Sequence, residues 1–170
     1  MARPADIAYR RSAVSKSGRE LKMRSITVKR RISAAPAAVW AVLADFPNIA
    51  AWNSSVTKSF STSESTSGVG AQRHCDLAPF GALEETVKEW EEVRRLVVNI
   101  DSAKKLPMSR GVATFLLNAA GDGANEAAIE FAYQPKFGVI GQLLGSIALD
   151  GQFTKGIPAF LKDLDTASTQ

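Results

Sequence analysis

Side chains that could take part in chemistry gather in two neighbouring segments of the sequence, residues 71–77 and 83–92. Both segments show the alternation of a β-strand, in which successive side chains point to opposite faces of a sheet. In each segment one set combines apolar residues with charges: Arg73, Cys75 and Leu77 in the first, and Leu83, Glu85, Val87 and Glu89 in the second. A hairpin that turns near Pro79 brings Arg73 opposite or diagonal to Glu85. The alternation therefore predicts an ion pair between adjacent strands.

A single histidine and a single cysteine exclude most conventional catalytic and metal sites. A zinc site draws three or four ligands from histidine, cysteine and carboxylates, and here only His74 and Cys75 are soft donors. These two residues are adjacent on one strand, so they point to opposite faces and form no nucleophile–base pair. We interpret Cys75 as a small buried apolar residue. We interpret His74 and Asp76, which share the other face, as a solvated surface pair rather than a catalytic one.

The glycine-containing segments lack the features of a phosphate-binding loop. Gly68-Val-Gly70 is not followed by a lysine and a helix, and Gly121-Asp-Gly123 has the composition of a hairpin turn. The sequence therefore predicts neither a metal nor a cofactor.

The elements that would position these residues follow from the hydrophobic periodicity. Seven segments are typical of strands in hairpin succession: 26–32, 56–61, 71–77, 83–92, 96–102, 108–119 and 125–133. A short helix at 37–44 and a helical turn at 49–52 follow the first strand, and 137–164 has the apolar spacing of a long helix. Internal glycines and Pro158 weaken that helix, so we expect it to bend or fray near 156–158. Helices only after the first strand and at the end favour an α+β fold.

The length and composition favour one domain. The chain has 170 residues, of which 45% are hydrophobic and 22% charged, and it lacks the roughly 18 consecutive apolar residues of a membrane span. We assign residues 25–165 to the domain, 166–170 to a tail and 1–24 to a disordered basic leader, with Met23 as an alternative start of translation. A lone cysteine allows no intrachain disulfide, and no segment resembles a secretory signal. These features favour a reducing, cytoplasmic setting.

The positive charge is concentrated at the start of the chain. Residues 1–31 contain ten Lys/Arg and two Asp/Glu, whereas the rest of the chain contains eleven Lys/Arg and fifteen Asp/Glu. The domain thus lacks the basic excess that holds nucleic-acid phosphates, and we predict that it binds no nucleic acid. A targeting or anion-binding arm is an alternative role for the leader.

Several motifs along the chain resemble those of a known superfamily. They are Ala-Pro36-x-x-Val39-Trp40-x-x-x-Ala44-Asp45-x-x-x-Ile49-x-x-Trp52, Val69-Gly70-Ala-x-Arg73, Leu83-Glu-Glu85-x-Val87-x-Glu89-Trp90, Arg94-Arg95-Leu96 and Tyr133-x-Pro135-Lys-Phe137-Gly138. Over residues 24–165 the chain is similar to the polyketide cyclase/dehydrase-like branch of the START-related superfamily, which includes lipid-transfer domains and the plant abscisic acid receptors. The resemblance implies a helix-grip fold, in which a seven-stranded twisted antiparallel sheet wraps around the C-terminal helix. It also implies a cavity between sheet and helix that takes an apolar ligand.

The resemblance suggests which face of the strands lines this cavity. By analogy with the plant receptors, the set with Arg73 and Glu85 points inward, where the pair either orients the polar end of a ligand or forms a partly exposed salt bridge at the sheet edge. Phe80 and Met108 lie in loops that resemble entrance loops, where they would act as lids or rest on their neighbours. The candidate ligand-binding residues are Arg73, Cys75, Leu77, Phe80, Leu83, Glu85, Val87, Met108, Phe115, Leu117, Phe131, Tyr133, Leu143, Leu144 and Ile147. The apolar ones would equally suit an ordinary packed core.

Three functions fit the resemblance, and all need space between the strands and the closing helix. The first is binding of a small hydrophobic or amphipathic molecule, such as a lipid, quinone, steroid-like compound or polyketide. The second is a polyketide cyclase or dehydratase in which Glu85 acts as acid/base and Arg73 stabilises an enolate. The third is a domain whose ligand-closed loops present a surface to a protein partner. Trp90, which the alternation places outward, would pack under the N-terminal segment or form a homodimer contact.

Overall fold

The computed structural model describes residues 7–8, 23–79, 81–121, 123–136 and 138–170, and the side chains of all of these except 7–8 and 138–152. The elements are, in chain order, β1 (Ile7–Ala8), β2 (Arg24–Ile32), α1 (Pro36–Ala44), the 3-10 helix η1 (Phe46–Ala51), β3 (Val56–Ser61), β4 (Gln72–Leu77), β5 (Ala82–Glu91), β6 (Arg95–Lys104), β7 (Met108–Ala119), β8 (Asn125–Pro135) and α2 (Gly138–Ser168). The seven predicted strands are present as β2 to β8. Each begins and ends within two residues of the predicted position.

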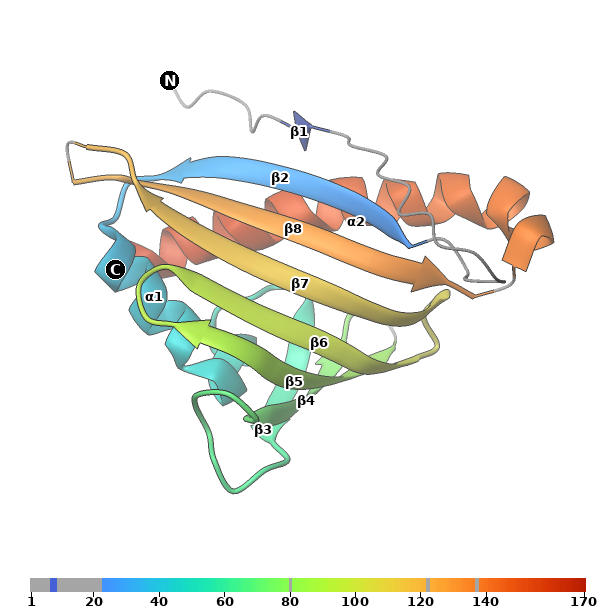
Figure 1. The fold of residues 1–170 in the computed structure, drawn as a ribbon, viewed down its shortest axis with the longest axis horizontal. Helices are drawn as coiled ribbons and strands as arrows, with labels where there is room; N and C mark the ends of the chain where they lie inside the picture. Colours follow the sequence, from blue (N-terminus) through green and yellow to red (C-terminus); the bar gives the residue numbers. More distant parts are fainter. Residues whose placement is uncertain (1–6, 9–22, 80, 122, 137) are drawn as a thin grey trace.

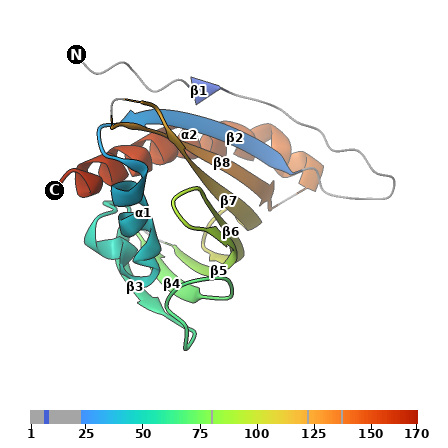
Figure 2. The same cartoon turned by 60° about the vertical axis from the view of Figure 1, so that its left-hand side comes forward.

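The strands form one antiparallel sheet in the order β1-β2-β8-β7-β6-β5-β4-β3 (Figure 1). From β3 to β8 every neighbour in the sheet is also the next strand in the sequence, so this part is a meander of hairpins. Strand β2 pairs with β8 over all of Arg24–Ile32. Helix α2 lies against one face of the curved sheet (Figures 1 and 2). The architecture is therefore the expected α+β helix-grip arrangement.

Helices α1 and η1 lie together at one end of the sheet (Figure 2). Pro36 begins α1, where its missing N–H removes no helical hydrogen bond. Val39, Trp40 and Leu43 recur at helical spacing and are buried. The following turn of η1 buries Phe46, which reaches the site described below.

Helix α2 continues through Pro158, which lies inside it. Of the two expectations near 156–158, fraying is therefore wrong, and a bend stays a prediction. Ile157 and Leu161 are both buried, so packing on each side of Pro158 holds this turn against the sheet. No helix in the described part of the chain is long and apolar enough to cross a membrane.

Two carboxylates fix the C-terminal half of α2 to the rest of the domain. Asp165 accepts hydrogen bonds from Arg30 Nε at 3.1 Å and Nη2 at 3.0 Å, both from β2. Asp163 accepts hydrogen bonds from the backbone N–H of Ser54 at 2.8 Å and from its hydroxyl at 2.7 Å. The helix end is therefore held by β2 on one side and by the segment after η1 on the other.

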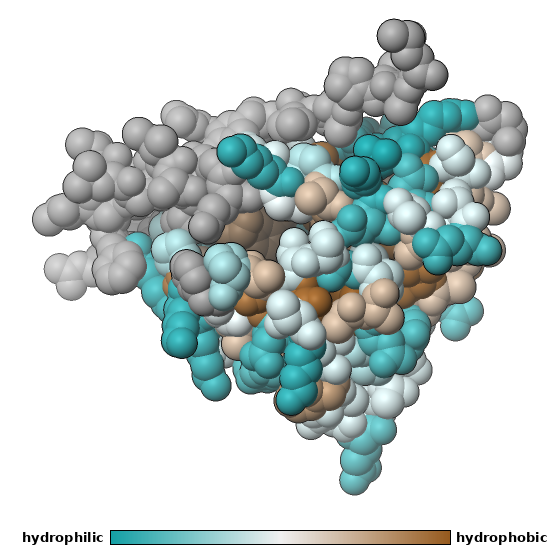
Figure 3. Space-filling model, turned by 180° about the vertical axis from the view of Figure 1, so that it is seen from behind, coloured by the Kyte–Doolittle hydropathy of each residue, from teal (hydrophilic) through white to brown (hydrophobic). Residues whose placement is uncertain are grey.

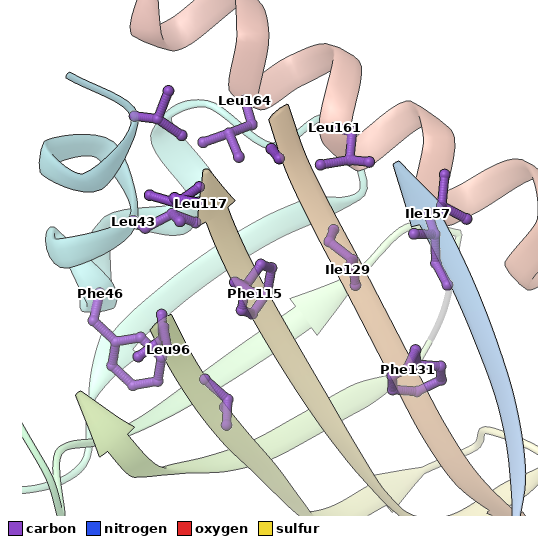
Figure 4. Packing of buried hydrophobic residues seen from close by; sticks show 14 of the residues in the cluster. Leu43, Phe46, Leu96, Phe115, Leu117, Ile129, Phe131, Ile157, Leu161 and Leu164 are labelled. Carbon is purple, nitrogen blue, oxygen red and sulfur yellow. The ribbon is translucent and has the colours of Figure 1, made fainter. Parts of the chain in front are cut away.

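The main hydrophobic cluster fills the space between the inner face of the sheet and the helices (Figure 4). Ile157 and Leu161 of α2 point toward Ile129 of β8 in this view. Phe46 lies beside Leu96 of β6. The sheet and three helical segments thus share one core, and the inner face of the sheet is the face that carries it.

Strand β5 departs from strict alternation at Lys88. Val87 and Glu89 pair with consecutive residues of β6, so Lys88 is an extra residue and forms a β-bulge. Beyond the bulge Glu89 is exposed, whereas the Trp90 ring packs edge-on against Trp40 of α1 with the ring centroids 5.1 Å apart. The expectations that Glu89 shares the inner face and that Trp90 points outward are therefore wrong. The Trp90 ring makes its contact within the protomer, so it gives no support to a homodimer.

Ile7 and Ala8 pair antiparallel with β2 and add a short strand to the edge of the predicted sheet. Of the first 22 residues, the structure describes these two. Residues 1–6 and 9–22 lie outside the described part of the chain, so the disordered leader stays a prediction.

Candidate ligand-binding site

Arg73 of β4 and Glu85 of β5 lie opposite each other in the register of the two strands. The guanidinium of Arg73 donates a hydrogen bond from Nε to Glu85 Oε2 at 2.7 Å. Only 7% of the Arg73 side chain and 8% of the Glu85 side chain are exposed. The expected pairing therefore forms, and it is buried rather than exposed at a sheet edge. A short charge-assisted hydrogen bond offsets part of the cost of removing both charges from water.

Phe46 of η1 holds the other side of the guanidinium. Arg73 Nη1 donates a hydrogen bond to the backbone carbonyl oxygen of Phe46 at 2.7 Å. The guanidinium carbon lies 4.0 Å from the centroid of the Phe46 ring, where the ring quadrupole stabilises a cation. Arg73 is thus fixed by β5 on one side and by η1 on the other.

Cys75 lies beside the ion pair and is 1% exposed. Its thiol donates to Glu85 Oε2 at a sulfur–oxygen distance of 3.5 Å. Burial, and secondarily the negative charge of Glu85, raise the pKa of the Cys75 thiol to about 12. At neutral pH Cys75 is therefore a protonated thiol without nucleophilic character.

A cavity of about 10 Å³ adjoins Arg73. Its lining consists of Val42, Leu43, Asp45, Phe46, Ile49, Trp52, Arg73, Leu96, Phe115 and Phe160. One water molecule needs roughly 10–15 Å³, whereas a small-molecule site has about 300 Å³ or more. The described side chains therefore form one polar corner of an apolar interior rather than a complete ligand cavity. On the side of the molecule opposite to Figure 1, some apolar side chains reach the surface among hydrophilic ones (Figure 3).

Four further predicted residues lie on the inner face of the sheet. Val87 and Phe115 are buried, and Leu77 and Leu83 are half-buried. Phe115 lines the cavity, whereas Leu77 and Leu83 pack with Cys75 in a small hydrophobic cluster. The inner face of the sheet is therefore apolar at these four positions.

The remaining described candidates lie farther along β7 and β8. Phe131 and Tyr133 pack against Phe153 of α2, with ring centroids 4.9 and 4.8 Å apart. Leu117 is buried close to Leu43 of α1 (Figure 4). The structure thus places these three candidates in the packed core rather than around the cavity beside Arg73.

Met108 begins β7 and is 1% exposed, so it is a core residue here and not part of an exposed entrance loop. The other expected lid, Phe80, lies outside the described residues. The side chains of Leu143, Leu144 and Ile147 also lie outside them, although their backbone belongs to α2. Their place in a cavity stays a prediction.

Three aromatic residues that line the cavity are absent from the sequence-based set: Phe46, Trp52 and Phe160. Trp52 and Phe160 meet edge to face with ring centroids 5.0 Å apart. Phe46 and Trp52 flank an irregular helical turn, where no alternation indicates the inward face. The helical spacing of Phe160 indicates burial but not that the ring borders a cavity.

On the outer face of the same hairpin, His74 lies between two carboxylates. Its Nδ1 is 2.7 Å from Glu84 Oε1, and its Nε2 is 3.1 Å from Asp76 Oδ1. The hydrogen bonds with Glu84 and then with Asp76 raise the pKa of His74 above 6.5. Phe60 of β3 stacks on the imidazole ring at a centroid distance of 5.0 Å. Across the described residues, no group of three histidine, cysteine or acidic side chains is arranged to hold a metal ion.

Comparison with known families agrees with this architecture. Residues 23–168 match the family described as polyketide cyclase / dehydrase and lipid transport. The chain belongs to this family. As a polyketide cyclase/dehydrase-like protein, it has the helix-grip fold that its sequence motifs indicate. No curated protein matches the sequence.

Solved structures of similar fold span nearly the whole family domain. TTHA0849 from Thermus thermophilus has a TM-score of 0.71 at 15% identity, covering 85% of this chain and 97% of its own. The Zhui aromatase/cyclase from Streptomyces sp. R1128 has a TM-score of 0.71 at 14% identity, covering 86% and 94%. A START superfamily protein from Mycobacterium smegmatis has a TM-score of 0.66 at 15% identity, covering 87% and 97%. At these identities the similarity establishes the fold alone.

Proposed function

We propose that the protein binds a small hydrophobic or amphipathic molecule, such as a lipid, quinone, steroid-like compound or polyketide, between its sheet and α2. The observation that carries the proposal is the buried Arg73–Glu85 pair on the inner face of the sheet. A buried ion pair adds little net stability, because apolar residues of similar volume often serve the fold as well. Its position beside an aromatic-lined cavity suits a polar anchor in an otherwise apolar site.

The chemistry of the anchor favours an uncharged oxygen on the ligand. Arg73 Nε and Nη1 are both occupied, by Glu85 and by the Phe46 carbonyl, whereas Nη2 has no hydrogen bond among the described residues. The positive charge of Arg73 is balanced by Glu85. A carbonyl or hydroxyl oxygen would accept from Nη2 without bringing a second unpaired charge into the interior.

The bulk of the ligand would lie away from the C-terminal half of α2. There, Phe153, Ile157 and Leu161 already pack on the sheet. We place the apolar part of the ligand under residues 138–152, where the candidates Leu143, Leu144 and Ile147 belong to the helix. Burial of apolar surface at about 25 cal/mol per Å² would supply most of the affinity.

The test is native mass spectrometry of the protein purified from its own host, followed by organic extraction. We expect a co-purifying apolar molecule that carries at least one oxygen. The variant Glu85→Gln should reduce the retained fraction. The matched control is Glu126→Gln, which makes the same change in an exposed ion pair with Lys29 and should leave retention unchanged. Absence of any bound molecule, together with equal behaviour of the two variants, would contradict the proposal.

A second candidate function is cyclisation or dehydration of a polyketide-like substrate. It is favoured by the arrangement around Glu85, whose Oε2 accepts both described hydrogen bonds, from Arg73 and Cys75. Oε1 has no hydrogen bond among the described residues, so it could accept a proton from a substrate carbon while Arg73 stabilises the enolate oxygen. Incubation with a poly-β-ketone thioester tests this function. We expect the wild-type protein to convert the thioester and Glu85→Gln to lose far more turnover than substrate affinity. Absence of turnover in the wild-type protein would contradict this function.

A further inference from the structure

His74 connects three strands on the outer face of the sheet. Both of its ring nitrogens face carboxylates, Glu84 on β5 at 2.7 Å and Asp76 on β4 at 3.1 Å. Phe60 of β3 covers the ring, and the Lys58 ammonium lies 5.2 Å from the Phe60 centroid. The His74 side chain is 16% exposed, so these contacts enclose most of the imidazole.

The outer cluster lies directly behind the inner ion pair. His74 pairs with Glu84 in the strand register, and the next register pair is Arg73 with Glu85. Neighbouring residues of one strand point to opposite faces of the sheet. The His74–Glu84 contact therefore links β4 to β5 on the outer face, and the Arg73–Glu85 contact links the same two strands on the inner face.

The register of β5 against β6 shifts between Glu84 and Glu85, with Glu84 opposite Ser102 and Glu85 opposite Ile100. The intervening residue of β6, Asp101, accepts a hydrogen bond from the Thr86 hydroxyl at 2.5 Å on the outer face. At such a bulge the ladder constrains the backbone less than elsewhere. The side-chain contacts of Glu84 and Glu85 therefore have more influence on the local geometry than they would in a regular ladder.

We propose that His74, Glu84 and Asp76 are positioning residues for the inner Arg73–Glu85 pair, and that the protonation state of His74 sets the geometry of that pair. An imidazolium donates one hydrogen bond to each carboxylate. A neutral ring donates only one and presents a lone pair to the other carboxylate, so one contact is lost on deprotonation. Deprotonation also removes the positive charge that strengthens the Glu84 contact, so the outer side of the bulge is held less firmly and Glu85 on its inner side shifts relative to Arg73.

The charged groups around His74 support protonation of the ring. Glu84 and Asp76 both carry negative charge toward it, and Asp101 adds a carboxylate on the adjoining strand. Lys58 opposes them from β3, but its ammonium lies over Phe60 rather than against the imidazole. The net surroundings are anionic, which agrees with the raised pKa of His74.

The experiment follows the Arg73 Nε–Hε resonance by NMR across the titration of His74. In the wild-type protein we expect the Arg73 Nε–Hε signal and the His74 ring signals to shift with the same pH midpoint. In His74→Gln we expect the Arg73 signal to be independent of pH. Lys162→Gln is the matched control, because it also removes one positive charge but from an exposed position on α2. In Lys162→Gln the Arg73 signal should shift with the same pH midpoint as in the wild type. If His74→Gln does not fold, Glu84→Gln replaces it with the same expectation.

An Arg73 signal that stays constant while His74 titrates would overturn the proposal. The consequence for binding rests on the proposed function, and a second readout separates the two. The affinity for the uncharged fluorescent probe Nile red, which carries a carbonyl oxygen, should change several-fold across the same midpoint in the wild type and remain flat in His74→Gln. A titrating Arg73 signal with constant probe affinity supports the positioning role and counts against the ligand site at this pair.

Discussion

At the level of single residues, the Arg73–Glu85 pair combines a large local cost with a small net contribution to the fold. Each partner compensates for the burial of the other, and the 2.7 Å contact leaves little room for water between them. Two apolar side chains of similar volume would need no such compensation. The pair is therefore expected to matter for stability only when it is broken.

This expectation is tested by comparing single and double substitutions. Glu85→Ala should lower the free energy of unfolding by about 3–5 kcal/mol, because it leaves the Arg73 charge buried without a counter-charge. The double variant Arg73→Met/Glu85→Leu should recover most of that loss. Urea denaturation monitored by circular dichroism measures both. A double variant as unstable as the single one would show that the pair contributes to the fold in its own right.

Cys75 should be chemically silent in the native protein. Its side chain is buried and burial raises the pKa of its thiol to about 12, so the thiolate population at pH 8 is negligible. We expect no labelling by iodoacetamide at pH 8 under native conditions, and one labelled site per chain in urea. Mass spectrometry gives the stoichiometry. Rapid native labelling would mean that the hairpin of β4 and β5 opens far more readily than its contacts indicate.

His74 should make stability depend on pH in a defined direction. Its pKa is raised in the folded state above the ordinary value of 6.5, mainly by the Glu84 hydrogen bond, so folding favours the protonated ring. The stabilisation is therefore fully present below about pH 6.5 and is lost as the pH rises through the folded-state pKa.

The difference in Tm between the wild type and His74→Gln measures this contribution. It should be largest near pH 6 and shrink steadily as the pH is raised to 9, in calorimetry at constant ionic strength. If this Tm difference grew with pH, folding would favour the neutral His74 ring rather than the protonated one.

At the level of elements, the sequence predicts regular strands well and their irregularities poorly. Alternation defined β4 and the first half of β5, and with a short hairpin it was enough to bring Arg73 opposite Glu85. The same alternation failed beyond Val87, because a bulge at Lys88 has no local sequence signal and reverses the faces of every later residue in the strand. The volume of the cavity beside Arg73 could not be predicted from the sequence either. It depends on how closely the rings of Phe46 and Phe160 approach the sheet from their helical segments.

The bulge gives a direct test of this explanation. Deleting Lys88 should remove the bulge but leave Glu89 opposite Val97 and Trp90 opposite Leu96, so the Trp90 ring should stay against Trp40 with little loss of stability. Lys88→Ala keeps the extra residue and should change the stability by less than about 0.5 kcal/mol, since Lys88 is exposed. Chemical denaturation together with tryptophan fluorescence follows both. Fluorescence typical of a solvent-exposed tryptophan in the deletion variant would contradict this register.

At the level of the whole molecule, charge and fold belong to different parts of the chain. Among the described side chains, the buried hydrophobic residues run from Ile26 to Leu164. The first 22 residues carry six basic and two acidic side chains, and the remainder of the chain carries fifteen of each. The excess positive charge therefore lies before Met23, in the sequence that precedes β2.

A variant that begins at Met23 should separate the two properties. The pairing of Ile7 and Ala8 with β2 is the described contact that this truncation removes, so the free energy of unfolding should fall by no more than about 1 kcal/mol. The formal charge should fall from +4 to zero, and retention on a cation-exchange column at low salt should be lost. Probe binding at the candidate site should be unchanged, because none of the residues that line it is removed. A truncated protein that unfolds or loses probe binding would instead make the leader part of the ligand-binding domain.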